Sequence, residues 1–241
     1  MAAAGDSITV GYNASGYGTF PQYSWSTGTY STLNSLRQRL VAASGTAIAG
    51  VNVAVVGANS DGLSTQVDSA VAQNADYLTV EIGANDACTP TTDTMTPVQV
   101  YRDRIKSALT KFLGAQTTNE VFIASIPSLY KMWSVSKGKF AARLIWASAS
   151  VCQSMLKNPS STSSTDETRR LFVQTRVDDY NKALAAVCVE LGTRCTFDNN
   201  EVAKYSFTST HISTADYFHP SIAGQRVLAE LTWPYSPYPN G

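Results

Sequence analysis

The sequence predicts an α/β fold in which helices cover both faces of a parallel sheet. Three short apolar runs, 51–56, 77–82 and 121–126, are each followed by glycine or proline. Runs of this length without alternation are typical of strands that are buried on both faces. Segments with helical periodicity lie between the runs, and strands that alternate with helices indicate a parallel sheet.

Four helices are predicted from apolar residues that recur every three or four positions. Glycine or proline follows several of them and marks where they end. The predicted helices lie around Leu33, Leu36 and Leu40, over 97–113 with a stop at Gly114, from a capping box of Ser164 and Glu167 to Leu191, and over 221–232. The polar stretch 158–165 between two helical segments is expected to be an exposed loop.

The bulk properties suit one large domain over 1–241, which is expected to be a monomer. Lys plus Arg and Asp plus Glu both number 18, so no net field attracts the chain to nucleic acid or to an anionic membrane. No apolar run is long enough for a transmembrane segment.

The four cysteines form no CxxC pair, so a structural zinc site has little support. Two disulfides fit better, and of the three connectivities we favour Cys188 with Cys195, which closes a short loop, and Cys88 with Cys152. The alternative is four buried free thiols in a cytosolic protein. Because charged residues are few and Ser and Thr are many, we predict an exported chain whose signal peptide has been removed.

Gly5-Asp6-Ser7-Ile8 and Asp216-Tyr217-Phe218-His219-Pro220, near the two ends, carry the candidate catalytic residues. Serine is a weak nucleophile until a neighbouring base takes its proton. The chain has two histidines, and only His219 has an acid, Asp216, shortly before it. We predict that Ser7 is the nucleophile, His219 the base and Asp216 the group that orients the base.

Each of these residues also suits an ordinary structural role. Ser7 is typical of a turn or a helix N-cap, and Asp216 of a cap or turn. His219 suits a surface position or the entry to a helix. An Asp-x-x-His motif together with an N-terminal Gly-Asp-Ser, in a chain with two histidines, favours the catalytic interpretation.

Two intermediate segments offer donors for an oxyanion, the negatively charged oxygen that forms when an ester is attacked. Asn85 offers a side-chain amide, and Gly57 offers a backbone N–H that no side chain obstructs. Together with the Ser7 N–H they form the predicted oxyanion hole. All three follow apolar runs and are expected at the carboxyl edge of the sheet, where such folds bind ligands. A turn asparagine and a strand-end glycine are the alternatives.

In this order, the blocks Gly-Asp-Ser, Gly, Gly-x-Asn-Asp and Asp-x-x-His resemble the SGNH, or GDSL-type, hydrolase family. Ser7, Gly57, Asn85 and His219 match its four signature positions, and Asp216 matches its triad acid. Segments 24–28, 83–88 and 216–220 further resemble secreted bacterial lipases and phospholipases. The resemblance implies a three-layer α/β/α, flavodoxin-like fold, hydrolysis without a metal or cofactor, and export.

The chain is therefore predicted to be an esterase or lipase that acts on a small-molecule or lipid ester, phospholipids included, through an acyl-enzyme. Its activity is expected to rise with pH as His219 loses its proton. The alternatives are a carbohydrate acetylesterase of the same fold and a non-catalytic secreted binding protein. Aromatic residues in the loop after Ser7 are candidates for substrate binding, with core packing as the alternative; they are Tyr12, Phe20, Tyr23 and Trp25.

Overall fold

The computed structural model describes residues 1–238, which contain a five-stranded sheet. The strand order is β2-β1-β3-β4-β5, and every neighbouring pair is parallel. This is the order of flavodoxin-like sheets. The strands are β1 (Ala2–Gly5), β2 (Val51–Asn52), β3 (Tyr77–Glu81), β4 (Glu120–Ile123) and β5 (Cys195–Phe197).

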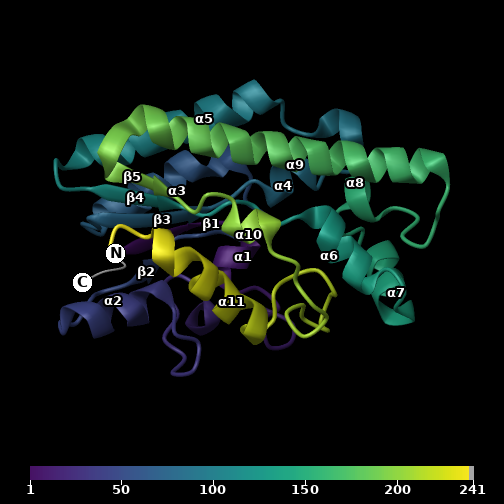
Figure 1. The fold of residues 1–241 in the computed structure, drawn as a ribbon, viewed down its shortest axis with the longest axis horizontal. Coiled ribbons are helices and arrows are strands. Elements are labelled where there is room, and N and C mark those ends of the chain that lie inside the picture. The colour runs from purple at the N-terminus through teal and green to yellow at the C-terminus, as the bar shows by residue number, and fades with distance from the viewer. Residues whose placement is uncertain (239–241) are drawn as a thin grey trace.

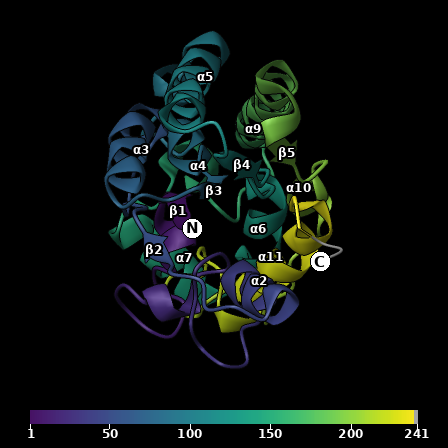
Figure 2. The ribbon, with the colours of Figure 1, turned by 90° about the vertical axis from the view of Figure 1, so that its left-hand side faces the viewer.

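The helices lie on both faces of the sheet, so the fold has three layers (Figure 1). They are α1 (Ser7–Val10), α2 (Leu36–Ser44), α3 (Leu63–Ala72), α4 (Ala84–Ala87), α5 (Val98–Ala115), α6 (Leu129–Ser136), α7 (Phe140–Ser148), α8 (Gln153–Leu156), α9 (Ser164–Leu191), α10 (Glu201–Lys204) and α11 (Ile222–Thr232). Figure 2 shows α3, α5 and α9 above the sheet and α2 and α11 below it. The predicted fold class is confirmed.

Side chains that alternate along the strands divide the core into two parts. Leu78 and Val80 of β3 join the larger cluster, which packs against α3, α5 and α9. Tyr77 and Phe122 point to the other face and join a smaller cluster around Trp25, with α2 and α11. Burial on both faces explains why the strands read as continuous apolar runs.

Several boundaries differ from the sequence prediction. Leu33, predicted to lie in a helix, precedes α2, and β4 ends at Ile123, before the end of the run 121–126. Two further differences have identifiable reasons. The run 51–56 is not one buried strand: β2 ends at Asn52, and Val55 and Val56 are exposed. β2 is an edge strand, so the chain leaves the sheet early, although Val55 N–H still donates to Gly5 O at 3.2 Å. The helix over 97–113 passes its predicted stop at Gly114 and ends one residue later.

The predicted capping box of α9 is also wrong by one residue. Ser163, not Ser164, caps the helix, and its side chain accepts from the Asp166 N–H. Glu167 instead forms an ion pair with Arg170. Several elements were not predicted, among them the helices α3, α6 and α10 and the strand β5.

The ends of β1 and β3 position the site. Gly5 pairs with Glu81 in the register of these neighbouring strands. In a sheet of this order, the connections leaving β1 and β3 turn to opposite faces, and a crevice opens between them. Ser7 follows β1, and Asn85 follows β3, so both leave the sheet at this crevice.

Candidate active site

Ser7 is the first residue of α1, directly after the turn that ends β1. The turn requires Gly5, because its φ is +149° and a Cβ there would lie 2.1 Å from Glu81 O. The Asp6 side chain accepts from the Ile8 N–H at 2.9 Å and thereby caps α1. This short strand-turn-helix unit holds Ser7, which is 6% exposed, at the carboxyl edge of the sheet.

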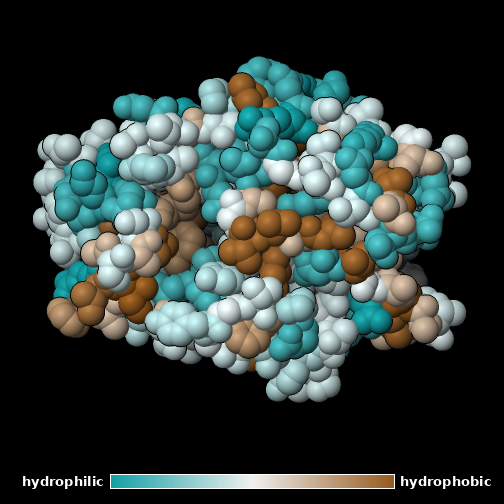
Figure 3. All heavy atoms as spheres, turned by 180° about the vertical axis from the view of Figure 1, so that it is seen from behind, coloured by the Kyte–Doolittle hydropathy of each residue, from teal (hydrophilic) through white to brown (hydrophobic). Residues whose placement is uncertain are grey.

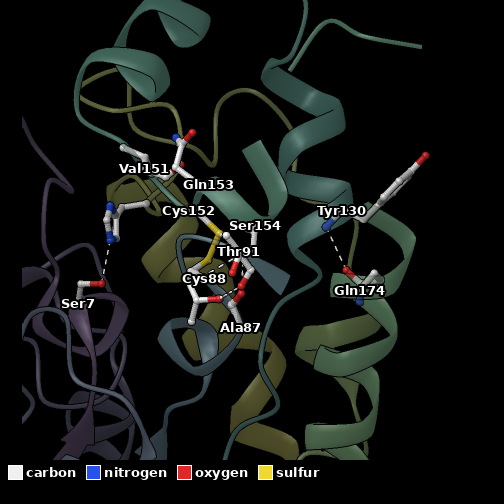
Figure 4. Close-up of a disulfide and its surroundings, with 12 residues drawn as sticks. Ser7, Ala87, Cys88, Thr91, Tyr130, Val151, Cys152, Gln153, Ser154 and Gln174 are labelled. Atoms are coloured by element: carbon white, nitrogen blue, oxygen red, sulfur yellow. Dashed lines mark hydrogen bonds between the residues drawn. A yellow bond between two sulfur atoms is a disulfide. The ribbon is translucent and has the colours of Figure 1, made fainter. Parts of the chain in front are cut away.

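The structure brings the three predicted catalytic residues together. His219 Nε2 lies 2.8 Å from Ser7 Oγ, a contact marked at Ser7 in Figure 4. His219 Nδ1 lies 2.5 Å from Asp216 Oδ2. The other carboxylate oxygen, Oδ1, accepts from the N–H groups of Phe218 and His219 at 2.9 Å each, which fixes the turn that carries the imidazole.

Asp216 is buried, but its surroundings favour the ionised form. Burial acts to raise its pKa, whereas hydrogen bonds from His219 and Asn13 and the charge of His219 act in the opposite direction. The second group of effects prevails and lowers the pKa of Asp216 to about 2. An ionised carboxylate at this position stabilises a positive charge on the imidazole and orients the ring.

Sequence analysis missed Asn13, which holds Asp216 from the side opposite the backbone turn. Its Nδ2 donates to Asp216 Oδ2 at 2.7 Å, and its Oδ1 accepts from the Gly18 N–H at 2.9 Å. Ser213 Oγ donates to Asn13 O at 2.5 Å. The φ of Asn13 is +57°, a region in which asparagine is enriched, and this turn preference was the only local signal.

Of the predicted oxyanion donors, Asn85 lies in the short helix α4 and Gly57 in the loop after β2, and the two segments meet at the same edge. Asn85 Nδ2 donates to Ala58 O at 2.8 Å, which joins the two segments and leaves the second amide proton available. Gly57 has a φ of +78°, a conformation that favours glycine, and open space where a Cβ would lie. Asp86 accepts from the Ser60 N–H and Oγ at 2.8 and 2.6 Å and so ties the same segments together.

A pair of buried carboxyl groups lies beneath the nucleophile turn. Asp6 and Glu81 are fully buried, and within residues 1–238 Asp6 Oδ2 and both Glu81 carboxyl oxygens have no hydrogen-bond partner. Burial raises the pKa of both groups, and the nearby charge of Asp6 raises that of Glu81 further. These surroundings therefore favour the neutral form of Glu81. The pair was not predicted from the sequence.

Three of the four predicted substrate-binding aromatics, Tyr12, Phe20 and Tyr23, are partly exposed. The Tyr12 ring meets the His219 ring edge-on, with centroids 5.2 Å apart. Phe20 and Tyr23 are half-buried and pack against each other with centroids 5.9 Å apart. Of these three rings, that of Tyr12 adjoins the predicted base, whereas those of Phe20 and Tyr23 pack against each other.

Trp25 is placed differently. Its side chain has no exposed surface and packs against Phe122 on the core face of the sheet. Its indole Nε1 donates to Thr9 Oγ1 at 3.2 Å, which supports α1 from below. In this structure Trp25 is a core residue, the alternative that the sequence left open.

The structure contains both predicted disulfides, Cys88–Cys152 and Cys188–Cys195. The first lies beside the site, as Figure 4 shows with Ser7 in the same view. Because Cys88 comes directly after α4, which carries Asn85, this disulfide ties that helix to the segment before α8.

Cavities also lie away from this site. A cavity of about 290 Å³, lined by Met1, Leu40 and Tyr77, lies at the opposite edge of the sheet, where the strands begin. Across residues 1–238, no group of three His, Cys, Asp or Glu is arranged to hold a metal ion. No helix in the same range is long and apolar enough to cross a membrane.

Comparisons with known proteins identify a family and a shared fold. The family model for GDSL-like lipases and acylhydrolases matches residues 1–232. The lipase Lip_vut3 from a goat rumen metagenome has a similar structure, with a TM-score of 0.60 and 12% identity over 99% of this chain and 97% of that chain. The extracellular lipase of Streptomyces rimosus gives a TM-score of 0.51 and 20% identity over 96% and 98%. The acetyl xylan esterase AlAXEase gives a TM-score of 0.56 and 13% identity over 97% of this chain and 98% of that chain.

At these identities the likeness to solved structures shows a shared fold alone. No curated protein sequence matches the chain.

Proposed function

The chain is a serine ester hydrolase of the GDSL-like lipase/acylhydrolase family, and we propose that Ser7, His219 and Asp216 are its catalytic triad. One observation carries the proposal: His219 Nε2 lies 2.8 Å from Ser7 Oγ while Nδ1 of the same ring faces Asp216. That arrangement lets one imidazole take a proton from serine while a carboxylate stabilises the resulting charge.

In the proposed mechanism, Ser7 Oγ attacks the ester carbonyl carbon as His219 Nε2 takes its proton. The tetrahedral intermediate then collapses, and the bond to the alkoxy oxygen breaks as that oxygen receives the proton from His219. Water attacks the acyl-enzyme in the same way, with His219 again as the base. The carboxylic acid leaves, and Ser7 regains its proton.

The proposed oxyanion hole consists of the Ser7 and Gly57 N–H groups and the Asn85 amide. Its support is positional: β1 and β3 end side by side, and the segment before Gly57 runs beside β1 as far as the Val55–Gly5 hydrogen bond. Asn85 retains one amide proton beyond its bond to Ala58 O. Loss of one such donor typically lowers kcat by about 10²–10³.

We propose fatty-acyl or other lipid esters as substrates, because the half-buried ring of Tyr12 adjoins His219 and the loop after Ser7 also carries the half-buried rings of Phe20 and Tyr23. A carbohydrate acetylesterase is the second candidate, since an acetyl xylan esterase has the same fold. A series of p-nitrophenyl esters from acetate to long acyl chains, run beside phosphatidylcholine and acetylated xylan, separates the two. Ser7→Ala is expected to fold normally and to turn over none of them.

We further propose that the protein is exported and monomeric. Two disulfides among residues 1–238 are typical of an oxidising compartment, and one structural neighbour is an extracellular lipase. Thiol titration of the unreduced protein from its native source is expected to find no free cysteine, and sedimentation is expected to give the mass of one chain. Four titratable thiols would contradict the export proposal.

A further inference from the structure

Helix α7 exposes apolar side chains to solvent. Phe140 and Leu144 lie one turn apart on the helix and are 74% and 59% exposed. The opposite side of the helix, with Ala142 and Trp146, is buried against the rest of the protein. A helix at a protein surface normally turns polar residues outward, so the apolar outer face of α7 lacks its usual cover.

The surroundings of this face are cationic. Residues 121–165 include no Asp or Glu but five basic residues, in a chain whose charges balance at 18 of each sign. Three of them, Lys137, Lys139 and Arg143, flank Phe140. None of the three forms a salt bridge within the described part of the chain. The balanced total charge therefore conceals a local positive region.

A cavity next to α7 extends this positive region. It has a volume of about 420 Å³ and is lined by Lys137 and Arg143, together with the hydroxyl groups of Ser160 and Ser161. Glu167 also lines it, but its carboxylate forms an ion pair at 3.1 Å with Arg170, whose side chain is fully buried. The unpaired charges at this cavity are therefore positive.

The α7 face lies next to the proposed triad. Trp146, on its buried side, donates from Nε1 to Asp216 O at 3.0 Å. Lys139 lies over the ring of Tyr217, with Nζ 5.3 Å from the centroid. In Figure 1, α6 and α7 lie at the right-hand end of the molecule, and Figure 3, seen from behind, shows hydrophobic surface at that end, at the lower left.

We propose that the α7 face, defined by Lys137, Lys139, Phe140, Arg143 and Leu144, binds an anionic lipid surface. Phe140 and Leu144 enter the boundary between headgroups and acyl chains, and Lys137 and Arg143 contact phosphate groups. An apolar stripe flanked by cations is complementary to such a surface and not to a neutral one. The inference extends the proposed function, since it places the triad beside a source of lipid esters.

Binding is tested with vesicles of ether-linked phospholipids, which contain no carboxylic ester and therefore report docking without hydrolysis. The protein is expected to sediment with vesicles of equal parts phosphatidylglycerol and phosphatidylcholine. It is expected to stay in solution with vesicles of pure phosphatidylcholine. Added salt is expected to weaken binding, because it screens the attraction between the basic residues and the lipid phosphates.

Two double variants separate the apolar contribution to vesicle binding from the cationic one. The double variant Phe140→Ser/Leu144→Ser is expected to weaken binding by more than about tenfold through lost apolar burial. Lys137→Gln/Arg143→Gln is expected to weaken it by about fivefold for each cation removed. Val189→Ser, which changes an 81% exposed side chain on α9, and Lys182→Gln, also on α9, are matched controls that should bind as the wild type does.

Hydrolysis of soluble p-nitrophenyl acetate and thermal unfolding of each variant complete the test. Weaker docking with unchanged soluble activity and stability supports the proposal. Equal binding to both kinds of vesicle, no binding to either, or undiminished binding by Phe140→Ser/Leu144→Ser would overturn it. If the protein docks on vesicles but cleaves no ester, the proposed function is contradicted and the docking proposal stands. If it cleaves soluble esters but does not dock, the docking proposal is contradicted and the proposed function stands.

Discussion

Asn13 and Asp216, which are 203 positions apart, form a buried hydrogen bond of 2.7 Å. The oxygen that accepts it, Oδ2, is the one that faces His219 Nδ1. Asn13 is itself fixed by Gly18 and Ser213, so the loop after the nucleophile determines where the carboxylate lies. Asn13 is thus a positioning residue that acts on the base through Asp216.

Asn13→Asp removes the amide donor, keeps the acceptor for the Gly18 N–H and places a second carboxyl group beside that of Asp216. We expect kcat to fall about ten- to hundredfold, because a hydrogen bond to a charged group contributes about 1.5–3 kcal/mol and the two carboxyl groups repel each other. KM for a small soluble ester should stay unchanged, since the Asn13 side chain is buried. Asn13→Gly tolerates the φ of +57° and adds no charge, so its kcat should fall less than that of Asn13→Asp. Steady-state kinetics in which both variants match the wild type would remove Asn13 from this role.

The low pKa of Asp216 predicts how stability depends on pH. Its carboxylate stabilises the fold above its ordinary pKa of 3.8, and this contribution is lost as the pH falls through about 2. At about 1.4 kcal/mol per unit, Asp216→Asn should lower the free energy of unfolding at neutral pH by about 2 kcal/mol. Urea unfolding over a pH series should show the two proteins converging in acid. A difference that is constant at all pH values would mean that packing, and not charge, explains the loss.

Glu81 predicts the opposite dependence. Its pKa is raised well above the ordinary 4.5, so the folded state binds the proton more tightly than the unfolded chain does. Stability due to Glu81 is complete below that ordinary value and is lost as the pH rises, by up to about 1.4 kcal/mol per unit. Glu81→Gln should reduce the decrease in the free energy of unfolding with rising pH, whereas Glu230→Gln, at an exposed position, should leave it unchanged. Parallel unfolding curves for Glu81→Gln and wild type would show that Glu81 ionises freely in the folded protein.

The two disulfides should differ in their effects. Cys88 and Cys152 are 64 positions apart, and Cys188 and Cys195 only 7. Loop-closure entropy then predicts a loss of about 4 kcal/mol for Cys88→Ser/Cys152→Ser and about 2 kcal/mol for Cys188→Ser/Cys195→Ser. Only the first pair adjoins the helix that carries Asn85, so only its removal should lower kcat in the folded protein. If both double variants lost the same free energy of unfolding and the same fraction of kcat, this distinction would be contradicted.

The residues that meet at the proposed site could be selected from sequence because their signals are local. Gly-Asp-Ser marks a strand-to-helix turn, and Asp-x-x-His places an acid one turn before a base. With two histidines in the chain, few pairings remained. The meeting of Ser7 and His219 follows from parallel strands that share one carboxyl edge.

Asn13 and Glu81 escaped prediction for the same physical reason. The role of each depends on a group that only folding brings near, Asp216 for Asn13 and Asp6 for Glu81. Glu81 even lies inside an apolar run, where its burial was predicted but its neutral carboxyl was not. Trp25 shows the converse case, since its position beside the nucleophile loop suggested substrate contact and folding placed it in the core.

The missed elements have simpler causes. β5 has three residues, too few for a period to be visible, and it is recognisable only through its pairing with β4. In α3 the buried positions Leu63, Val67 and Ala70 follow helical spacing, but Ser, Thr and Gln interrupt the apolar stripe. Gln66 is buried there because its side chain bonds to both the N–H and the C=O of Gly5. That the chain forms one domain over 1–241 stays a prediction.

The measurement that tests the central proposal most directly is covalent labelling by a fluorophosphonate, followed by peptide mass mapping. Only a serine whose proton is taken by a base reacts readily with such a reagent. The account predicts one adduct, on Ser7, and no adduct on the folded Ser7→Ala variant. An adduct on another residue, or equal labelling of Ser7→Ala, would contradict it.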